Sequence, residues 1–198
     1  LNLPRHEKGN AMTVSIELQM EQMGQRAKKA ARVLSAAAPA AKTQALRALA
    51  ALLIERQPDI LKANALDVDA AKAANMDAPR LDRLTLTPRI MADMADACLH
   101  VAEMADEVGV IEQQWQRPNG LMIGKMRIPL GVIAMIFESR PNVTIDAAIL
   151  CLKAGDAVIL RGGSEAIHSN LALAGLLHEA LRSAGLPEDA AQVVETTD

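Results

Sequence analysis

The sequence predicts an α/β protein in which amino-terminal helices are followed by a hairpin and a parallel βαβαβ unit. Three observations point to the parallel unit. Residues 132–137 are continuously apolar, which is typical of a strand covered on both faces in a parallel sheet. Pro141 suits the first turn of a helix, and Gly155 is placed to end that helix in a left-handed conformation. A second strand at 157–160 then completes a βαβ crossover.

The first hundred residues predict a run of alanine-rich helices. Apolar side chains recur at helical spacing in three stretches, 16–30, 46–53 and 60–66. Thr43 is a candidate cap for the second stretch. Thr87 followed by Pro88 predicts a further helix start, because threonine can cap and proline tolerates the first helical position.

Residues 110–127 predict a hairpin. Asn119-Gly120 stands between two alternating segments, which is a strong signal for a tight turn between antiparallel strands. Trp115 is the single tryptophan of the chain and lies on the first of these strands. Two interpretations stay open for Trp115: it lies at an interface, or it packs against its own domain.

Composition favours a soluble, cytoplasmic protein that binds neither nucleic acid nor a membrane. The formal net charge is −3, and no apolar stretch reaches the roughly 20 residues of a membrane span. The two cysteines, Cys98 and Cys151, have no metal-ligand spacing and are expected to be reduced and buried. Met12 is a plausible natural start, so residues 1–14 are expected to be a disordered or non-native tail.

The FESRPN turn (137–142) follows the first strand of the unit, and a second turn follows the strand at 157–160. Both turns are expected to face the same crevice. Arg161 ends the strand, Gly162 and Gly163 permit a tight turn, and Ser164 is expected to cap a helix that runs to about Ser183. Backbone N–H groups at the carboxyl end of a parallel sheet are where α/β folds hold cofactors. Without a GxGxxG or GxxxxGKS pattern, however, the signal from the residues alone is weak.

The phrases IPLGVI, FESRPNVT and AAILCLKAGDAVILRGGSEAIHSN resemble the glutamate-5-semialdehyde dehydrogenases, or γ-glutamyl phosphate reductases, of the aldehyde dehydrogenase superfamily. The resemblance extends along nearly the whole chain after Met12. A complete member is about twice as long, so the resemblance implies that residues 15–198 are the amino-terminal part of an NADP-binding domain. It also implies that the catalytic domain is absent from this chain.

The resemblance implies that NADP(H) is the cofactor. The turn at RGGSE matches the element that grips the adenosine ribose, and Arg161 would favour a 2′-phosphate through a bidentate pair. Glu165 would repel that phosphate, so it either points away or contacts a ribose hydroxyl. The implied cofactor-binding residues are Phe137, Arg161, Gly162, Gly163, Ser164 and Glu165.

The resemblance also implies three residues for the chemistry. Asn142 matches the asparagine whose amide stabilises the oxyanion formed when a cysteine attacks the carbonyl. Arg140 is expected to anchor the phosphate or carboxylate of the substrate, or else to pair with Glu138, and Ser139 is expected to donate a further hydrogen bond. Neither Cys98 nor Cys151 matches the nucleophile, and no metal ligands are expected.

The function implied by the resemblance is NADPH-dependent reduction of L-glutamyl 5-phosphate to L-glutamate 5-semialdehyde and phosphate, a step of proline synthesis. The chain alone is expected to be inactive because the nucleophile is missing. A homo-oligomer formed through the 110–127 hairpin and contact with glutamate 5-kinase are also implied. Two alternatives stay open: another acylating aldehyde dehydrogenase with an acidic substrate, and a non-catalytic cofactor-binding or interaction module.

Overall fold

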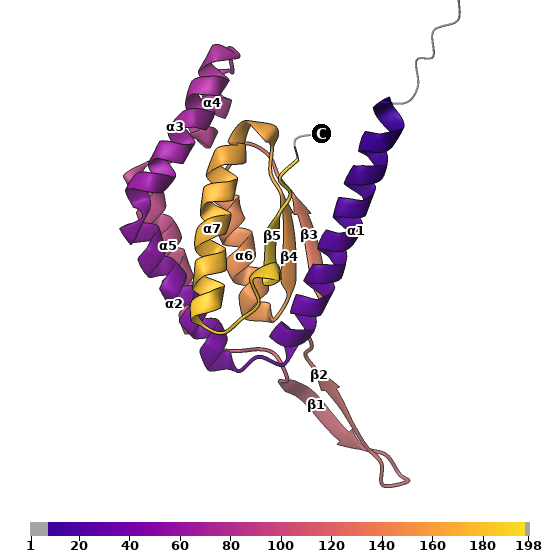
Figure 1. Ribbon diagram of the computed structural model, residues 1–198. Helices are drawn as coiled ribbons and strands as arrows, with labels where there is room; N and C mark the ends of the chain where they lie inside the picture. The colour runs from indigo at the N-terminus through magenta and orange to yellow at the C-terminus, as the bar shows by residue number, and fades with distance from the viewer. Residues whose placement is uncertain (1–7, 197–198) are drawn as a thin grey trace, which may run out of the picture.

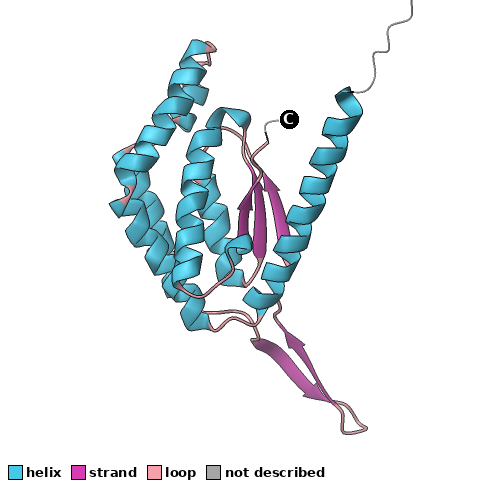
Figure 2. Ribbon diagram, in the orientation of Figure 1, coloured by secondary structure: helices cyan, strands magenta, loops and turns pink. Residues whose placement is uncertain are grey.

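A small parallel sheet lies between one long helix and two further layers of helices (Figure 1). The computed structural model describes residues 8–196. Helix α1 covers one face of the sheet, α6 and α7 cover the other, and α2, α3 and α5 pack against the outside of α6 and α7 (Figures 1 and 2). The fold class expected from the sequence is confirmed.

The amino-terminal helices are α1 (Lys8–Ser35), α2 (Pro39–Glu55) and α3 (Gln57–Ala73). The tail expected over 1–14 is helical from Lys8, and its first seven residues lie outside the described residues. Thr43 does not cap α2, because Pro39 takes a first-turn position and the helix begins there. The buried face of α1 follows the predicted helical spacing and comprises Ala27, Ala30, Ala31 and Leu34.

Two shorter helices follow, α4 (Ala78–Leu84) and α5 (Pro88–Glu103). The start of α5 is as predicted, since Thr87 Oγ1 accepts a hydrogen bond from the N–H of Ile90 at 3.2 Å. Helix α4 was not predicted from the sequence. Asp77 caps it in the same manner, by accepting a hydrogen bond from the N–H of Arg80. Helix α4 lies at the end of the molecule toward which the parallel strands point (Figure 1).

The predicted hairpin is confirmed and extends away from the body (Figure 1). Strands β1 (Ile111–Gln116) and β2 (Met122–Met126) are antiparallel, and Gly120 adopts a positive φ of 86° in the turn between them. Trp115 lies opposite Ile123 and is 39% exposed. The hairpin therefore presents Trp115 away from the core of the chain.

The parallel sheet has the order β3-β4-β5. Its elements in chain order are β3 (Val132–Ile136), α6 (Val143–Ala154), β4 (Ala157–Arg161), the 3₁₀ turn η1 (Ser164–Ala166), α7 (Ile167–Ser183), a second 3₁₀ turn η2 (Glu188–Ala190) and β5 (Ala191–Val193). Gly155 ends α6 with a φ of 81°, as predicted. This connectivity places the turns after β3 and β4 at one edge of the sheet.

Strand β3 corrects one expectation, because it is not covered on both faces. It lies at the edge of the sheet, and its side chains alternate between exposed and partly buried. Ile136 is 81% exposed and Leu130, just before the strand, is 86% exposed. The continuous apolar sequence predicted coverage of both faces, but the described helices cover the central strand β4 more completely than the edge strand β3. No helix among residues 8–196 is long and apolar enough to cross a membrane.

Candidate functional site

The turns after β3 and β4 lie side by side at the carboxyl edge of the sheet. Strands β3 and β4 pair in register, and the N–H of Phe137 donates to the carbonyl oxygen of Arg161 at 3.0 Å. The polar residues of the FESRPN turn (137–142) and of the RGGSE turn (161–165) are thereby brought together. The structure thus unites two groups of candidate residues that are separated by helix α6 in the sequence.

Glu165 links the two turns. Its Oε1 accepts hydrogen bonds from the N–H of Ser139 at 3.0 Å and from Ser139 Oγ at 2.5 Å. Burial alone would raise the pKa of Glu165, but the hydrogen bonds from Ser139 and the charge of Arg80 outweigh burial and hold the pKa below its usual value. The single hydroxyl proton of Ser139 is thus engaged by Glu165, and a hydrogen bond from Ser139 to a substrate stays a prediction.

Neighbouring side chains closely approach Gly162 and Gly163. A Cβ atom on Gly162 would lie 2.2 Å from Asn170 Nδ2 and 3.2 Å from Phe137 Cε2. A Cβ atom on Gly163 would lie 2.4 Å from the Glu165 carboxylate. Neither glycine has a positive φ, so space, and not a left-handed turn, explains both. The RGGSE turn therefore packs tightly against Asn170, Phe137 and Glu165.

Arg161 leaves the end of β4 beside this turn. Its Nη1 donates to the carbonyl oxygen of Gly162 at 3.1 Å, and its side chain is partly buried. The rest of the guanidinium makes no hydrogen bond to any residue that the structure describes. Arg161 thus has donors left for an anionic ligand.

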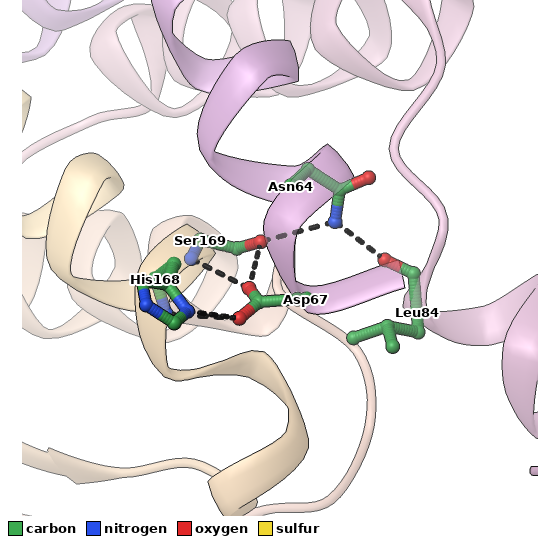
Figure 3. Close-up of polar contacts among 5 residues, drawn as sticks. All are labelled: Asn64, Asp67, Leu84, His168 and Ser169. Atoms are coloured by element: carbon green, nitrogen blue, oxygen red, sulfur yellow. Dashed lines mark hydrogen bonds and ion pairs between the residues drawn. The ribbon is translucent and has the colours of Figure 1, made fainter. Parts of the chain in front are cut away.

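Ser164 does not cap the following helix, which corrects the expectation from the sequence. A 3₁₀ turn intervenes, and α7 begins only at Ile167. The cap comes instead from Asp67 of α3, whose carboxylate accepts from the N–H groups of His168 at 3.1 Å and Ser169 at 2.8 Å (Figure 3). Asp67 is 2% exposed, so it is a buried cap supplied by another helix.

Further side chains complete the contacts around Asp67 (Figure 3). Ser169 Oγ donates to Asp67 Oδ2 at 2.6 Å, and the ring Nδ1 of His168 lies 2.7 Å from Asp67 Oδ1. Asn64 donates to Ser169 Oγ and to the carbonyl oxygen of Leu84, which ties the end of α4 to the start of α7. Asn64, Asp67 and Ser169 are buried, and no sequence pattern predicted that they would meet.

Asn142 lies at the start of α6 but does not cap it. The first N–H groups of α6 bond to backbone carbonyls, including those of Arg140, Pro141 and Asn142. The Asn142 amide instead donates to Asp146 Oδ2, one turn along the helix, at 2.9 Å. Burial raises the pKa of Asp146, and the hydrogen bond from Asn142 offsets part of that rise. An amide has two N–H groups, so one is left to donate elsewhere.

A cavity of about 370 Å³ opens beside Asn142, and we call it the Arg83–Arg140 cavity. Its lining is Asp82, Arg83, Ile90, Asp93, Met94, Arg140, Asn142 and Asp146. Arg140 forms no ion pair with Glu138, nor with any other described residue, which removes that alternative. Arg83 was missed from the sequence because it belongs to α4, whose position over the turn is set by tertiary packing.

The two cysteines are buried thiols, as expected. Burial, with a smaller contribution from the charge of Asp146, raises the pKa of Cys98 to about 12. Burial, together with the charge of Asp156, raises the pKa of Cys151 to about 11. Neither thiol is therefore a ready nucleophile at neutral pH.

A larger cavity, about 900 Å³, lies elsewhere and holds none of the candidate residues. It lies between α1 and the segment that joins β2 to β3, at the amino end of the parallel strands, and its lining is mainly apolar. Ligands of parallel α/β sheets bind outside the carboxyl ends of the strands, so the smaller cavity is the better candidate. Within the described residues, no group of three or more His, Cys, Asp or Glu side chains is arranged to hold a metal ion.

Comparison with known proteins identifies the family. The sequence profile described as "Aldehyde dehydrogenase family" matches residues 7–198. The chain belongs to the aldehyde dehydrogenase family. This aldehyde dehydrogenase chain is similar to a gamma-glutamyl phosphate reductase of Nitratidesulfovibrio vulgaris strain DP4, with 69% identity over 185 residues, and to one of Mesorhizobium japonicum, with 51% identity over 196 residues. The family expected from the sequence phrases is thereby confirmed.

Solved structures show the same aldehyde dehydrogenase fold. The gamma-glutamyl phosphate reductase of Thermotoga maritima matches 89% of this chain with a TM-score of 0.87 and 38% identity, and the chain covers 43% of that structure. The corresponding yeast enzyme, from Saccharomyces cerevisiae, matches 89% with a TM-score of 0.84 and 28% identity, at 46% coverage. Among the curated relatives, the chain spans 44% of the Nitratidesulfovibrio protein and 45% of the Mesorhizobium protein, while those matches cover 93% and 99% of the chain.

Proposed function

We propose that this chain is the amino-terminal, cofactor-binding part of an NADPH-dependent γ-glutamyl phosphate reductase. The complete protein would reduce L-glutamyl 5-phosphate to L-glutamate 5-semialdehyde and phosphate in proline biosynthesis. The observation that carries the proposal is 69% identity, over 93% of the chain, to a protein of that name. The geometry supports the proposal, since an available asparagine amide and a tight glycine turn both follow paired strands at the carboxyl edge of a parallel sheet.

The RGGSE turn fits the adenosine end of a nicotinamide cofactor. Gly162 and Gly163 are partly exposed, and the remaining donors of Arg161 suit the 2′-phosphate of NADP. Ser139 occupies Oε1 of Glu165, which leaves Oε2 to accept a hydrogen bond from a ribose hydroxyl. Phe137 and Ser164 border the same turn. When bound, the cofactor supplies the hydride for the reduction.

Asn142 and Arg140 would act on the substrate. The free N–H of the Asn142 amide stabilises negative charge on the acyl oxygen, while Asp146 holds the amide in place. Arg140 has no ion-pair partner among residues 8–196 and is available to an anionic group of the substrate. The cysteine that attacks the acyl phosphate is neither Cys98 nor Cys151, because both thiols are buried with raised pKa values.

We also propose an oligomeric state, a location and a partner for the complete protein. The exposed hairpin with Trp115 would join subunits of a homo-oligomer. The protein would work in the cytoplasm, in functional contact with glutamate 5-kinase. Sedimentation of the complete protein with and without residues 111–126 tests the first point, since loss of the hairpin is expected to lower the mass of the assembly.

Calorimetric titration of the 198-residue chain with NADPH tests the cofactor proposal. Saturable binding is expected, and Arg161→Gln is expected to weaken it by about 10-fold through loss of a charged hydrogen bond. Arg47→Gln, on the exposed surface of α2, is the matched control and should bind as the unaltered chain does. The chain alone is expected to show no turnover.

A second candidate is a non-catalytic module, favoured by the absence of a usable thiol in the described residues. If neither NADPH nor NADH binds the folded chain, the module is supported and the cofactor proposal fails. If the polypeptide extended to the length of its relatives oxidises glutamate semialdehyde with phosphate and NADP⁺, the reductase is supported.

A further inference from the structure

We infer that the Arg83–Arg140 cavity binds the α-amino-acid end of the substrate. The enzyme would then recognise the α-carboxylate and the α-ammonium of the substrate as well as its acyl phosphate. The inference rests on the proposed function and adds the residues that select the substrate. It assigns Arg83 and Arg140 to the α-carboxylate and Asp93, aided by Asp82, to the α-ammonium.

The two arginines provide an unused anion site. Arg83 is on α4 and Arg140 is in the FESRPN turn, and both line the cavity. Neither guanidinium makes a hydrogen bond or ion pair with any side chain in the part of the chain that the structure describes. Two guanidinium groups on one cavity are well suited to a planar carboxylate.

The acidic residues argue for a ligand that also carries a positive charge. Asp82, Asp93 and Asp146 line the same cavity, so its three carboxylates outnumber its two guanidinium groups. Asp146 is engaged by the Asn142 amide. Asp93 has only a long, exposed contact of 3.9 Å with Arg89. A simple dianion would be repelled by these carboxylates, whereas an α-amino acid matches both signs of charge.

The apolar lining and Asn142 fix how such a ligand lies. Ile90 and Met94 are four residues apart on α5 and therefore lie on one face of that helix, where they can contact the methylene groups of a glutamyl chain. Asn142 also lines the cavity, and its free N–H would contact the reacting acyl oxygen. The lining therefore has a group for each part of a γ-acyl derivative of an α-amino acid.

The experiment uses the complete enzyme in the oxidising direction, with phosphate and NADP⁺. Three aldehydes are compared: glutamate 5-semialdehyde, 5-oxopentanoate, which lacks the ammonium, and 4-aminobutanal, which lacks the carboxylate. Arg83→Gln is expected to lower kcat/KM for glutamate semialdehyde by about 10- to 100-fold and to leave 4-aminobutanal unchanged. Asp93→Asn is expected to lower kcat/KM for glutamate semialdehyde by about 10-fold and to leave 5-oxopentanoate unchanged.

Two exposed residues away from the cavity give matched controls. Arg47→Gln on α2 and Asp69→Asn on α3 should leave all three rates unchanged, and circular dichroism checks that each variant is folded. Equal losses with every aldehyde, or no loss with any, would overturn the subsite while the reductase stands. No oxidation of glutamate semialdehyde by the unaltered enzyme would instead overturn the proposed function.

Discussion

The two helices that leave the functional edge of the sheet begin in different ways. Helix α6 starts with backbone hydrogen bonds of its own turn, so the Asn142 side chain is not needed as a cap and contacts Asp146 instead. Helix α7 takes its cap from Asp67, which is a hundred residues away in the sequence (Figure 3). In neither case does a polar side chain of the preceding turn cap the helix. Backbone carbonyls accept the first N–H groups of α6, and Asp67 of a distant helix accepts those of α7.

If the two helices begin in these different ways, the largest effect on stability is expected from Asp67→Ala. The substitution leaves two backbone N–H groups and the Ser169 hydroxyl without their buried acceptor, and we expect a loss of about 3 kcal/mol in the free energy of unfolding. Urea titration followed by far-ultraviolet circular dichroism measures it. The neighbouring, exposed Asp69→Ala should change stability by less than about 0.5 kcal/mol. Equal effects of the two variants would show that α7 does not depend on a distant cap.

The second largest effect is expected from Gly162→Ala. The new Cβ would meet Asn170, which is buried and accepts a hydrogen bond from Thr144 at 3.0 Å, so α7 must shift at a cost of about 2 kcal/mol. Gly163→Ala is the matched comparison. There the Cβ meets only the movable carboxylate of Glu165, and reduced freedom of the unfolded chain offsets the loss, so stability should change little. The same urea titration measures both, and a larger effect at Gly163 would contradict the packing described for this turn.

A smaller effect is expected from Asp146→Ala. Removal of the acceptor frees the Asn142 amide at a cost of about 1 kcal/mol, because a single hydrogen bond is lost. Nuclear magnetic resonance of the side-chain amides should show increased motion of Asn142. In Asp146→Asn the side-chain oxygen can still accept, so the amide should stay ordered. An amide that is equally ordered in the alanine variant would mean that Asp146 does not position it.

The smallest effects concern pH, and the carboxyl groups of Glu165 and Asp146 should respond with opposite signs. The lowered pKa of Glu165 means that its stabilising contribution is present above its ordinary value of 4.5 and is lost as the pH falls through the folded-state pKa. The raised pKa of Asp146 means that its contribution is present below its ordinary value of 3.8 and is lost as the pH rises through the folded-state pKa.

The variants Glu165→Gln and Asp146→Asn separate these two contributions. Glu165→Gln should reduce the loss of stability on acidification below pH 4.5, and Asp146→Asn should raise stability at neutral pH more than at pH 3, each by less than about 1 kcal/mol. Free energies of unfolding measured across this range provide the test. Parallel pH curves for the two variants would contradict the opposite signs.

The features that the sequence predicted are those specified by neighbouring residues. The Asn119-Gly120 hairpin, the Thr87 cap of α5 and the left-handed Gly155 are all local, and all three appear in the structure. The meeting of the FESRPN and RGGSE turns also followed, since adjacent parallel strands end at one edge.

The features that the sequence did not predict depend on tertiary contacts. Ser164 has the right chemistry for a cap, but a 3₁₀ turn delays α7, and Asp67 reaches its N–H groups from α3. Arg83 joins the cavity only because α4 packs near the turn after β3. Exposure of Ile136 depends on which strand lies at the edge of the sheet, and apolar composition alone does not reveal that.

The hairpin gives the chain an unusually selective optical probe. The sequence has one tryptophan and no tyrosine, so Trp115 dominates both absorbance near 280 nm and intrinsic emission. Because Trp115 lies on β1 and is 39% exposed, its emission reports the hairpin and not the helices or the parallel sheet. A shift of that emission to shorter wavelength as protein concentration rises would follow assembly directly, with no added label.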